Sequence, residues 1–108
     1  MARLGERSWV GPSFSMYFKF EWDARKARTN FRKHGVTFEE ARTVFLDPFA
    51  AFFDDPDHSK DEARELVVGD SNRGRLLFVS FTERDGKVRI ISARAATRVE
   101  RQDHEEFI

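Results

Sequence analysis

Five side chains of this sequence could together carry out chemistry on a phosphate. They are Lys33, His34, Glu62, Arg64 and Arg94. Arginine and lysine stabilise negative charge that develops on a phosphate, and histidine or glutamate transfers protons. An RNA substrate carries its own nucleophile, the 2′-hydroxyl, so a protein that cleaves RNA must orient that group, move protons and stabilise charge. This set of residues therefore predicts RNA cleavage as a candidate activity.

Three of these candidates also have a structural interpretation that the sequence leaves open. Arg64 could form an ion pair with the acidic segment that precedes it, and Arg94 could pair with Glu100. His34 comes just before a glycine at a predicted helix end, where it could cap exposed carbonyl groups. Each of these roles explains its residue as well as catalysis does.

A second group of polar residues predicts RNA binding. It consists of Arg25, Lys26, Asn30 and Arg89. The formal net charge of the chain is zero, but its charges are segregated into two basic blocks on either side of an acidic one. Basic side chains hold phosphates irrespective of base sequence, and an asparagine can contact a base or a sugar. The alternative is that both basic blocks are solvated faces whose arginine stems cover the edge of a sheet.

Several kinds of site have no support in the sequence. There is no cysteine, and the histidines at positions 34, 58 and 104 lack the spacing of zinc ligands. The segment from Asp55 to Asp61 alternates like a calcium loop, but Lys60 stands at the glycine position and Leu66 at the final glutamate position. No glycine-rich phosphate loop, dinucleotide fingerprint or G-x-S-x-G motif occurs. We therefore expect neither a metal ion nor a cofactor.

The length of the chain, 108 residues, is that of one domain with one hydrophobic core. Residues 1–16 lack periodicity and contain glycine, proline and serine, so we expect a flexible N-terminal extension followed by a folded domain over 17–108. Met16 is a second candidate start. The sequence has neither an apolar run of about 18 residues nor a signal-peptide pattern, so we expect a cytoplasmic protein.

Two helices are predicted near the start of this domain. Asp23 is a candidate N-cap, Ala24, Ala27, Phe31 and His34 recur at helical spacing, and Gly35 is a candidate C-terminal glycine. The next helix begins with a capping box of Thr37 and Glu40, presents Phe38, Ala41 and Phe45 on one face, and ends at Asp47-Pro48. A third, polar helix follows the capping box of Thr97 and Glu100.

Strands are predicted over 17–22, 49–53, 66–69, 76–82 and 88–95, with a loop over 54–65. Asp85-Gly86 is a favoured hairpin pair, which places Phe81 opposite Ile90 and Leu77 opposite Arg94. In that register Arg94 shares a sheet face with Phe81, and Arg89 lies on the other face. The element order predicts an α+β fold: a small antiparallel sheet with the two N-terminal helices on one face and a C-terminal helix.

The sequence resembles the BrnT family of toxins from about Tyr17 to its C-terminus. The motifs that carry the resemblance are Trp22-Asp23, Lys33-His34-Gly35, Phe38-Glu39-Glu40-Ala41, Asp57-His58-Ser59, Arg73-Gly74-Arg75 and Ile91-Ser92-Ala93-Arg94. The order and spacing of these motifs, more than any one of them, make the resemblance specific.

The resemblance implies a RelE-like fold and a ribonuclease toxin of a type II toxin-antitoxin system. It implies that RNA is cleaved without a metal ion, that translation is arrested, and that a BrnA-type antitoxin neutralises the toxin. The ribbon-helix-helix part of such an antitoxin would let the complex bind promoter DNA. The competing hypothesis is a module that binds RNA or a protein without catalysis.

Overall fold

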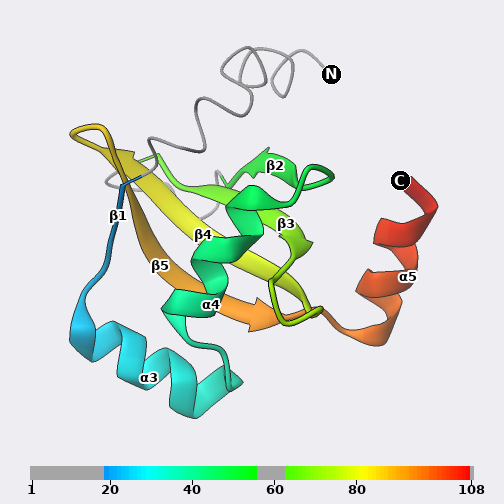
Figure 1. Cartoon of the computed structure of the whole chain (residues 1–108), viewed down its shortest axis with the longest axis horizontal. Helices are drawn as coiled ribbons and strands as arrows, with labels where there is room; N and C mark the ends of the chain where they lie inside the picture. The colour runs from blue at the N-terminus through cyan, green and yellow to red at the C-terminus, as the bar shows by residue number, and fades with distance from the viewer. Residues whose placement is uncertain (1–18, 56–62, 108) are drawn as a thin grey trace.

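A five-stranded mixed sheet forms the centre of the computed structural model, which describes residues 19–55 and 63–107 (Figure 1). Its strands are β1 (Phe20–Glu21), β2 (Ala51–Asp54), β3 (Glu65–Asp70), β4 (Leu76–Arg84) and β5 (Lys87–Ala95). They lie in the order β1-β5-β4-β3-β2. The prediction of a purely antiparallel sheet is wrong at one edge, because β1 runs parallel to β5. This pairing joins the start of the described chain to its last strand, a contact that local sequence patterns do not encode.

The helices begin directly after the predicted N-caps, and the first of them ends at the predicted glycine. They are α3 (Ala24–His34), α4 (Phe38–Arg42) and α5 (Arg98–Phe107), with a 3-10 helix, η1 (Thr43–Leu46), directly after α4. The predicted second helix is divided, because the α-helical part ends at Arg42 and the 3-10 helix continues to Leu46, just before Asp47. The Asp23 carboxylate accepts a hydrogen bond from the Lys26 amide at 3.0 Å, and Gly35 ends α3 with φ of 68°. The Thr37 hydroxyl accepts from the Glu40 amide at 3.0 Å. These local rules therefore predicted the positions of the helices correctly.

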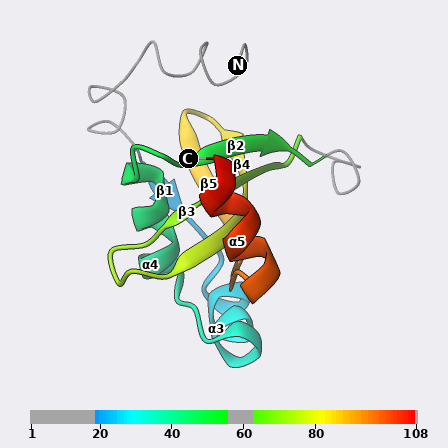
Figure 2. The same ribbon diagram turned by 90° about the vertical axis from the view of Figure 1, so that its right-hand side faces the viewer.

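The hydrophobic core lies between the sheet and the α4–η1 segment. Phe38, Ala41, Val44 and Phe45 from that segment pack against strand residues that include Val79. Figure 2 shows α4 on one side of the sheet and α3 near its lower end. Of the residues that recur at helical spacing in α3, Ala27 packs against the core, but Phe31 is 52% exposed and Asn30 is the buried residue of this helix.

The β4–β5 hairpin contains a β-bulge that reverses one prediction. Asp85 and Gly86 form the turn with positive φ, and Phe81 lies opposite Ile90 as expected. The next pair is Ser80 with Ser92, so Ile91 is an extra residue in β5. Because one extra residue exchanges the two faces of a strand, Arg94 pairs with Phe78 and lies on the face opposite the core. Arg89, paired with Thr82, lies on that same face.

Some sequence predictions fall outside the described residues. They concern the flexible extension over 1–16, the first part of the strand over 17–22, and most of the loop between β2 and β3. The ends of that predicted loop belong to strands, since Asp54 closes β2 and Glu65 opens β3. Within the described part of the chain, every helix is too short or too polar to cross a membrane.

Candidate functional site

The sheet face opposite the core carries a cavity of about 270 Å³. Its lining comes from the end of α3, from the chain on both sides of the β2–β3 connection, and from β3, β4 and β5. The lining residues are His34, Asp55, Arg64, Leu66, Phe78, Ser80, Ser92, Ala93 and Arg94. Three of the five predicted catalytic residues, His34, Arg64 and Arg94, thus meet at one cavity.

The β-bulge in β5 brings Arg94 to this cavity. Its guanidinium carbon lies 4.5 Å from the centroid of the Phe78 ring, and its two Nη atoms donate to the Glu100 carboxylate at 2.8 and 2.9 Å. The ion pair predicted between these residues is therefore confirmed. Glu100 raises the pKa of Arg94, while Arg94 together with the Thr97 amide lowers the pKa of Glu100 to about 2. The Arg94 side chain is still 41% exposed, so a phosphate can reach it but must share it with Glu100.

Arg64 precedes β3 and is held through the backbone on both of its sides. The Thr82 hydroxyl donates to the Ala63 carbonyl at 2.7 Å, and the Asp55 amide donates to the Arg64 carbonyl at 2.9 Å. The second bond extends the β2–β3 ladder past its last strand pair. The half-buried Arg64 side chain therefore starts from a fixed backbone at the cavity wall.

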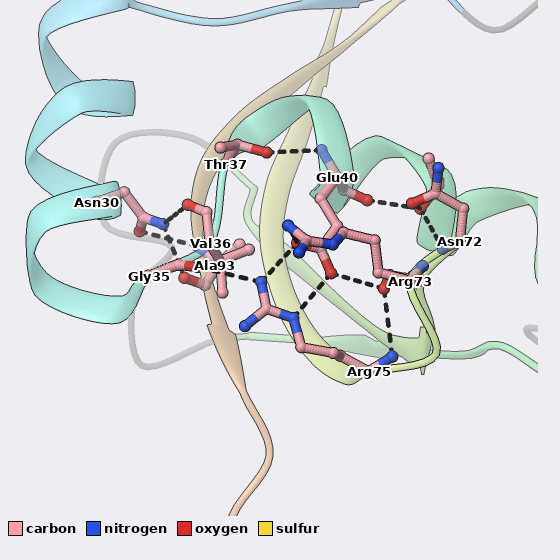
Figure 3. A network of polar contacts seen from close by, with 11 residues as sticks. Asn30, Gly35, Val36, Thr37, Glu40, Asn72, Arg73, Arg75 and Ala93 are labelled. Carbon is pink, nitrogen blue, oxygen red and sulfur yellow. Dashed lines mark hydrogen bonds and ion pairs between the residues drawn. The ribbon is translucent and has the colours of Figure 1, made fainter.

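His34 is the exposed last residue of α3, and Asn30, one helical turn earlier, fixes that helix end. Asn30 is 5% exposed. Its Nδ2 donates to the carbonyls of Val36 at 3.0 Å and Ala93 at 2.8 Å, and its Oδ1 accepts from the Ala93 amide at 3.0 Å (Figure 3). The predicted RNA contact of Asn30 is therefore wrong: its amide is buried and is used to attach α3 to β5 beside Arg94.

A buried carboxylate on α4 also helps to fix the C-terminal end of α3. Glu40 of α4 is 5% exposed, accepts a hydrogen bond from the Ser71 hydroxyl at 2.7 Å, and pairs with Arg75. Arg75 also donates from Nη2 to the Gly35 carbonyl at 3.0 Å (Figure 3). The hydrogen bond from Arg75 keeps the pKa of Glu40 below its usual value. The connection between α3 and α4, which follows His34 directly, is thus fixed by Asn30 and Arg75.

The sequence did not reveal the structural roles of Asn30, Glu40 and Arg75. Glu40 stands at the third position of a helix, where a glutamate often bonds back to its own N-cap. Here it bonds to Arg75 and Ser71, more than 30 residues away. A single sequence carries no signal for a pair so distant.

The other predicted residues that the structure describes do not line the cavity. Lys33, Arg25 and Lys26 are exposed on α3, and Arg89 pairs with Glu21 of β1 at 3.5 Å. Glu62 lies outside the described residues. Within 19–55 and 63–107, no three histidine, aspartate or glutamate side chains are close enough to share a metal ion.

The fold and the cavity define a small α+β protein with cationic groups gathered on an open sheet face. Residues 22–100 match the family described as "Ribonuclease toxin, BrnT, of type II toxin-antitoxin system". Because this match covers most of the sequence, the chain belongs to the BrnT family, as the resemblance predicted. The family implies an antitoxin partner and an RNA substrate.

A solved structure agrees with this assignment. The chain is similar to the crystal structure of the Brucella abortus ribonuclease toxin BrnT, with a TM-score of 0.59 and 26% sequence identity. The likeness covers 75% of this chain and 99% of the Brucella chain. A search of curated proteins gave no significant match.

Proposed function

We propose that this chain is an endoribonuclease that cleaves RNA without a metal ion and thereby arrests translation in the cytoplasm. The observation that carries the proposal is the meeting of His34, Arg64 and Arg94 at one cavity of about 270 Å³. Two guanidinium groups can bind the scissile phosphate and stabilise the charge that develops on it. The histidine supplies a group that can transfer protons beside them.

In the proposed reaction the 2′-hydroxyl oxygen attacks the adjacent phosphorus, and the bond from phosphorus to the 5′-oxygen breaks. A general base accepts the 2′-hydroxyl proton, and a general acid donates a proton to the leaving 5′-oxygen. His34 and Glu62 are our candidates for these two roles. Lys33 directly precedes His34 and is exposed, and we propose it as a further cation for the phosphate. The products are a 2′,3′-cyclic phosphate and a 5′-hydroxyl.

The RNA strand would approach along the exposed basic side of α3. Arg25 and Lys26 are our candidates for contacts to its phosphates, because both are exposed on this helix. Arg89 lies on the same sheet face as Arg94 and is a further candidate. Asn30 is left out of this surface because it is buried.

We propose a BrnA-type antitoxin as the partner that keeps the toxin inactive. In this arrangement the complex binds promoter DNA only through the ribbon-helix-helix part of the antitoxin. A second candidate function, RNA binding without cleavage, is favoured by one observation: Glu100 occupies both Nη atoms of Arg94. In that case the cavity would hold a phosphate but would not lower the barrier to its cleavage.

Induced expression of the full chain in bacteria, with growth and total RNA followed over time, tests these alternatives. We expect growth arrest with RNA loss, reversed by co-expression of the antitoxin and abolished by Arg64→Ala and by Arg94→Ala. Arg101→Ala, which removes an exposed arginine of α5, is the matched control and should remain toxic. Circular dichroism and antitoxin binding must show that the inactive variants are folded.

Three other results would each contradict a part of this proposal. Full toxicity of both arginine variants would remove Arg64 and Arg94 from the site. Folded wild-type protein that binds RNA but leaves it intact would favour the binding module. Cleavage by purified protein that stops in the presence of a chelator would contradict metal independence.

A further inference from the structure

An exposed aromatic ring continues one side of the cavity across the sheet. Phe53 of β2 lies opposite Leu66 of β3, Leu66 lies opposite Ser80 of β4, and Ser80 lies opposite Ser92 of β5. Directly paired residues have their side chains on the same face of a sheet. Leu66, Ser80 and Ser92 all line the cavity, so Phe53 is the next side chain in a row of cavity residues.

Phe53 is accessible at this position. Its side chain is 50% exposed, although phenylalanine is commonly buried. Neighbouring strands are about 5 Å apart, so Phe53 lies about 10 Å from Ser80 in the middle of the row. A ligand group seated in the cavity therefore does not cover the ring, but an adjacent group of the same ligand can reach it.

The charged side chains that flank this row indicate which part of a nucleotide each side of the cavity suits. Arg94 and His34 meet the cavity at its β5 side, where a phosphate is favoured. Towards β2 the cavity wall carries Arg64 and Asp55, whose carboxylate offsets the cationic charge. This pair lies two positions along the ladder from Leu66 and Phe53, so the Phe53 ring is next to it on the same face. A second phosphate has little electrostatic reason to bind there. An uncharged, flat and apolar group, such as a base, fits that position better.

We propose that Phe53 is a stacking platform for a base of single-stranded RNA, on a nucleotide next to the phosphate held in the cavity. This proposal rests on the proposed function and specifies its substrate class. Exposed aromatic side chains on sheets stack on unpaired bases, and each such contact strengthens binding by about tenfold or more. A base in a duplex is covered by its neighbours and cannot stack on a side chain, so the platform selects single strands.

The test measures binding of a 2′-deoxy oligonucleotide, which cannot be cleaved because it lacks the 2′-hydroxyl nucleophile. The dissociation constant is determined by fluorescence anisotropy for a single strand and for the same sequence as a blunt duplex. The variants of the full chain are Phe53→Ala and Phe53→Trp. Phe49→Ala is the matched control, since Phe49 is 65% exposed but lies in the turn before β2 and not in the row.

We expect Phe53→Ala to raise the dissociation constant of the single strand about tenfold and that of the duplex less than twofold. Phe53→Trp should bind the single strand at least as tightly as the wild type, and its additional fluorescence should be quenched by the strand. Phe49→Ala should bind like the wild type. These three results together would establish a stacking contact at Phe53.

Other outcomes would overturn the platform. They are an unchanged single-strand affinity in Phe53→Ala, an equal loss for strand and duplex, and the same loss in Phe49→Ala. A variant that binds the strand normally but loses antitoxin binding or self-association would make this face a protein-docking surface instead.

The result also separates the platform from the nuclease. A wild-type protein with Phe53-dependent strand binding that never cleaves RNA would retain the platform and refute the nuclease. RNA cleavage by the wild type together with unchanged strand binding by Phe53→Ala would support the nuclease and refute the platform.

Discussion

At the scale of single residues, the position of His34 depends on the side-chain amide of Asn30. Asn30 bonds to both the amide and the carbonyl of Ala93, whose neighbours Ser92 and Arg94 line the cavity. It is also one helical turn from His34. The Asn30 side-chain amide thus fixes the C-terminal end of α3 against β5.

Replacing Asn30 with alanine should damage both stability and turnover. The substitution leaves two carbonyls and one amide of the interior without their partner, which should lower the free energy of unfolding by about 2 to 3 kcal/mol. We expect kcat for RNA cleavage to fall about tenfold or more, because His34 is no longer positioned, while KM changes less than twofold. Denaturant unfolding and steady-state cleavage at a temperature where the variant is folded measure the two effects.

Asp47→Ala provides a matched control for this prediction. The Asp47 carboxylate also joins two backbone segments, accepting from the amides of Phe49 at 2.9 Å and Asp70 at 2.7 Å, but it does not line the cavity. The Asp47→Ala variant should have a lower free energy of unfolding than the wild type but an unchanged kcat. A fully folded Asn30→Ala protein with normal kcat would show that Asn30 has only a structural role.

The sequence identified the candidate residues by type, but it could not show which of them meet. His34 lies at the end of α3, Arg64 lies 30 positions later just before β3, and Arg94 lies a further 30 positions along in β5. Residue chemistry suggested their roles, whereas their grouping depends on strand order and on the end of α3. Asn30 was misassigned because its polarity suggested the surface, and burial is a property of the tertiary structure.

At the scale of elements, α5 is tied to the site through its first turn. The Glu100 amide donates to the Thr97 hydroxyl at 3.1 Å, and the Thr97 amide donates to Glu100 Oε1 at 2.9 Å, which completes the predicted capping box. The same carboxylate binds Arg94. A change in the charge of Glu100 therefore affects both the helix start and the cavity.

This arrangement predicts a pH dependence of stability. The pKa of Glu100 is lowered from 4.5 to about 2 in the folded protein, so folding favours the charged form. Its contribution is complete above about pH 5 and is lost as the pH falls through the range from 4.5 to 2. Because both partners are partly exposed, we expect that contribution to be about 1 kcal/mol.

The measurement is the difference in free energy of unfolding between wild type and Glu100→Gln from pH 6 to pH 2. Glutamine retains the capping oxygen and removes only the charge, so the difference should shrink towards zero at the acid end. Glu105→Gln, an exposed site on the same helix, should show little difference at any pH. A difference for Glu100→Gln that does not change with pH would contradict the ion-pair origin.

The elements themselves divide into those that local sequence predicts and those that it does not. The three helix starts, the Gly35 end and the Asp85-Gly86 turn follow from caps and turn residues within a few positions. The parallel β1 and the bulge in β5 do not, because both depend on pairing between distant strands or on a register shift. The element order supplied the α+β fold class without these details.

At the scale of the whole molecule, zero net charge conceals a strongly basic α3. Its five arginine and lysine residues are all exposed, and none lines the cavity. We therefore expect Arg25, Lys26, Arg28 and Arg32 to contribute to RNA affinity through the phosphate backbone and not to turnover, whereas Lys33, next to His34, is proposed to act in cleavage.

The double variant Arg25→Gln, Lys26→Gln tests this division of roles. Each phosphate contact contributes about −0.7 to the slope of log K against log salt concentration for a single strand, so losing two should reduce the slope by about 1.4. The value of kcat at saturating RNA should stay within twofold. The measurement is binding of the uncleavable strand over a series of salt concentrations, together with saturating kinetics.

Arg98→Gln with Arg101→Gln, two exposed arginines of α5, is the control of equal charge. This α5 double variant should leave the slope of log K against log salt concentration unchanged. An unaltered slope in the α3 variant would show that RNA does not follow this helix.

The extra residue in β5 has a consequence for insertions and deletions. Substitutions in this strand alter one side chain at a time, but loss of the single residue Ile91 would restore regular alternation. Arg94 would keep its pairing with Phe78 on the cavity face, because Ile90, Ser92, Ala93 and Arg94 already lie opposite four successive residues of β4. Only a register shift that placed Ile91 opposite Ser80 would pair Arg94 with Leu77 and turn it towards the core. The register of β5 on β4 beyond the bulge therefore decides whether this strand can present a cation to a phosphate, and a strand without Ile91 would retain that register.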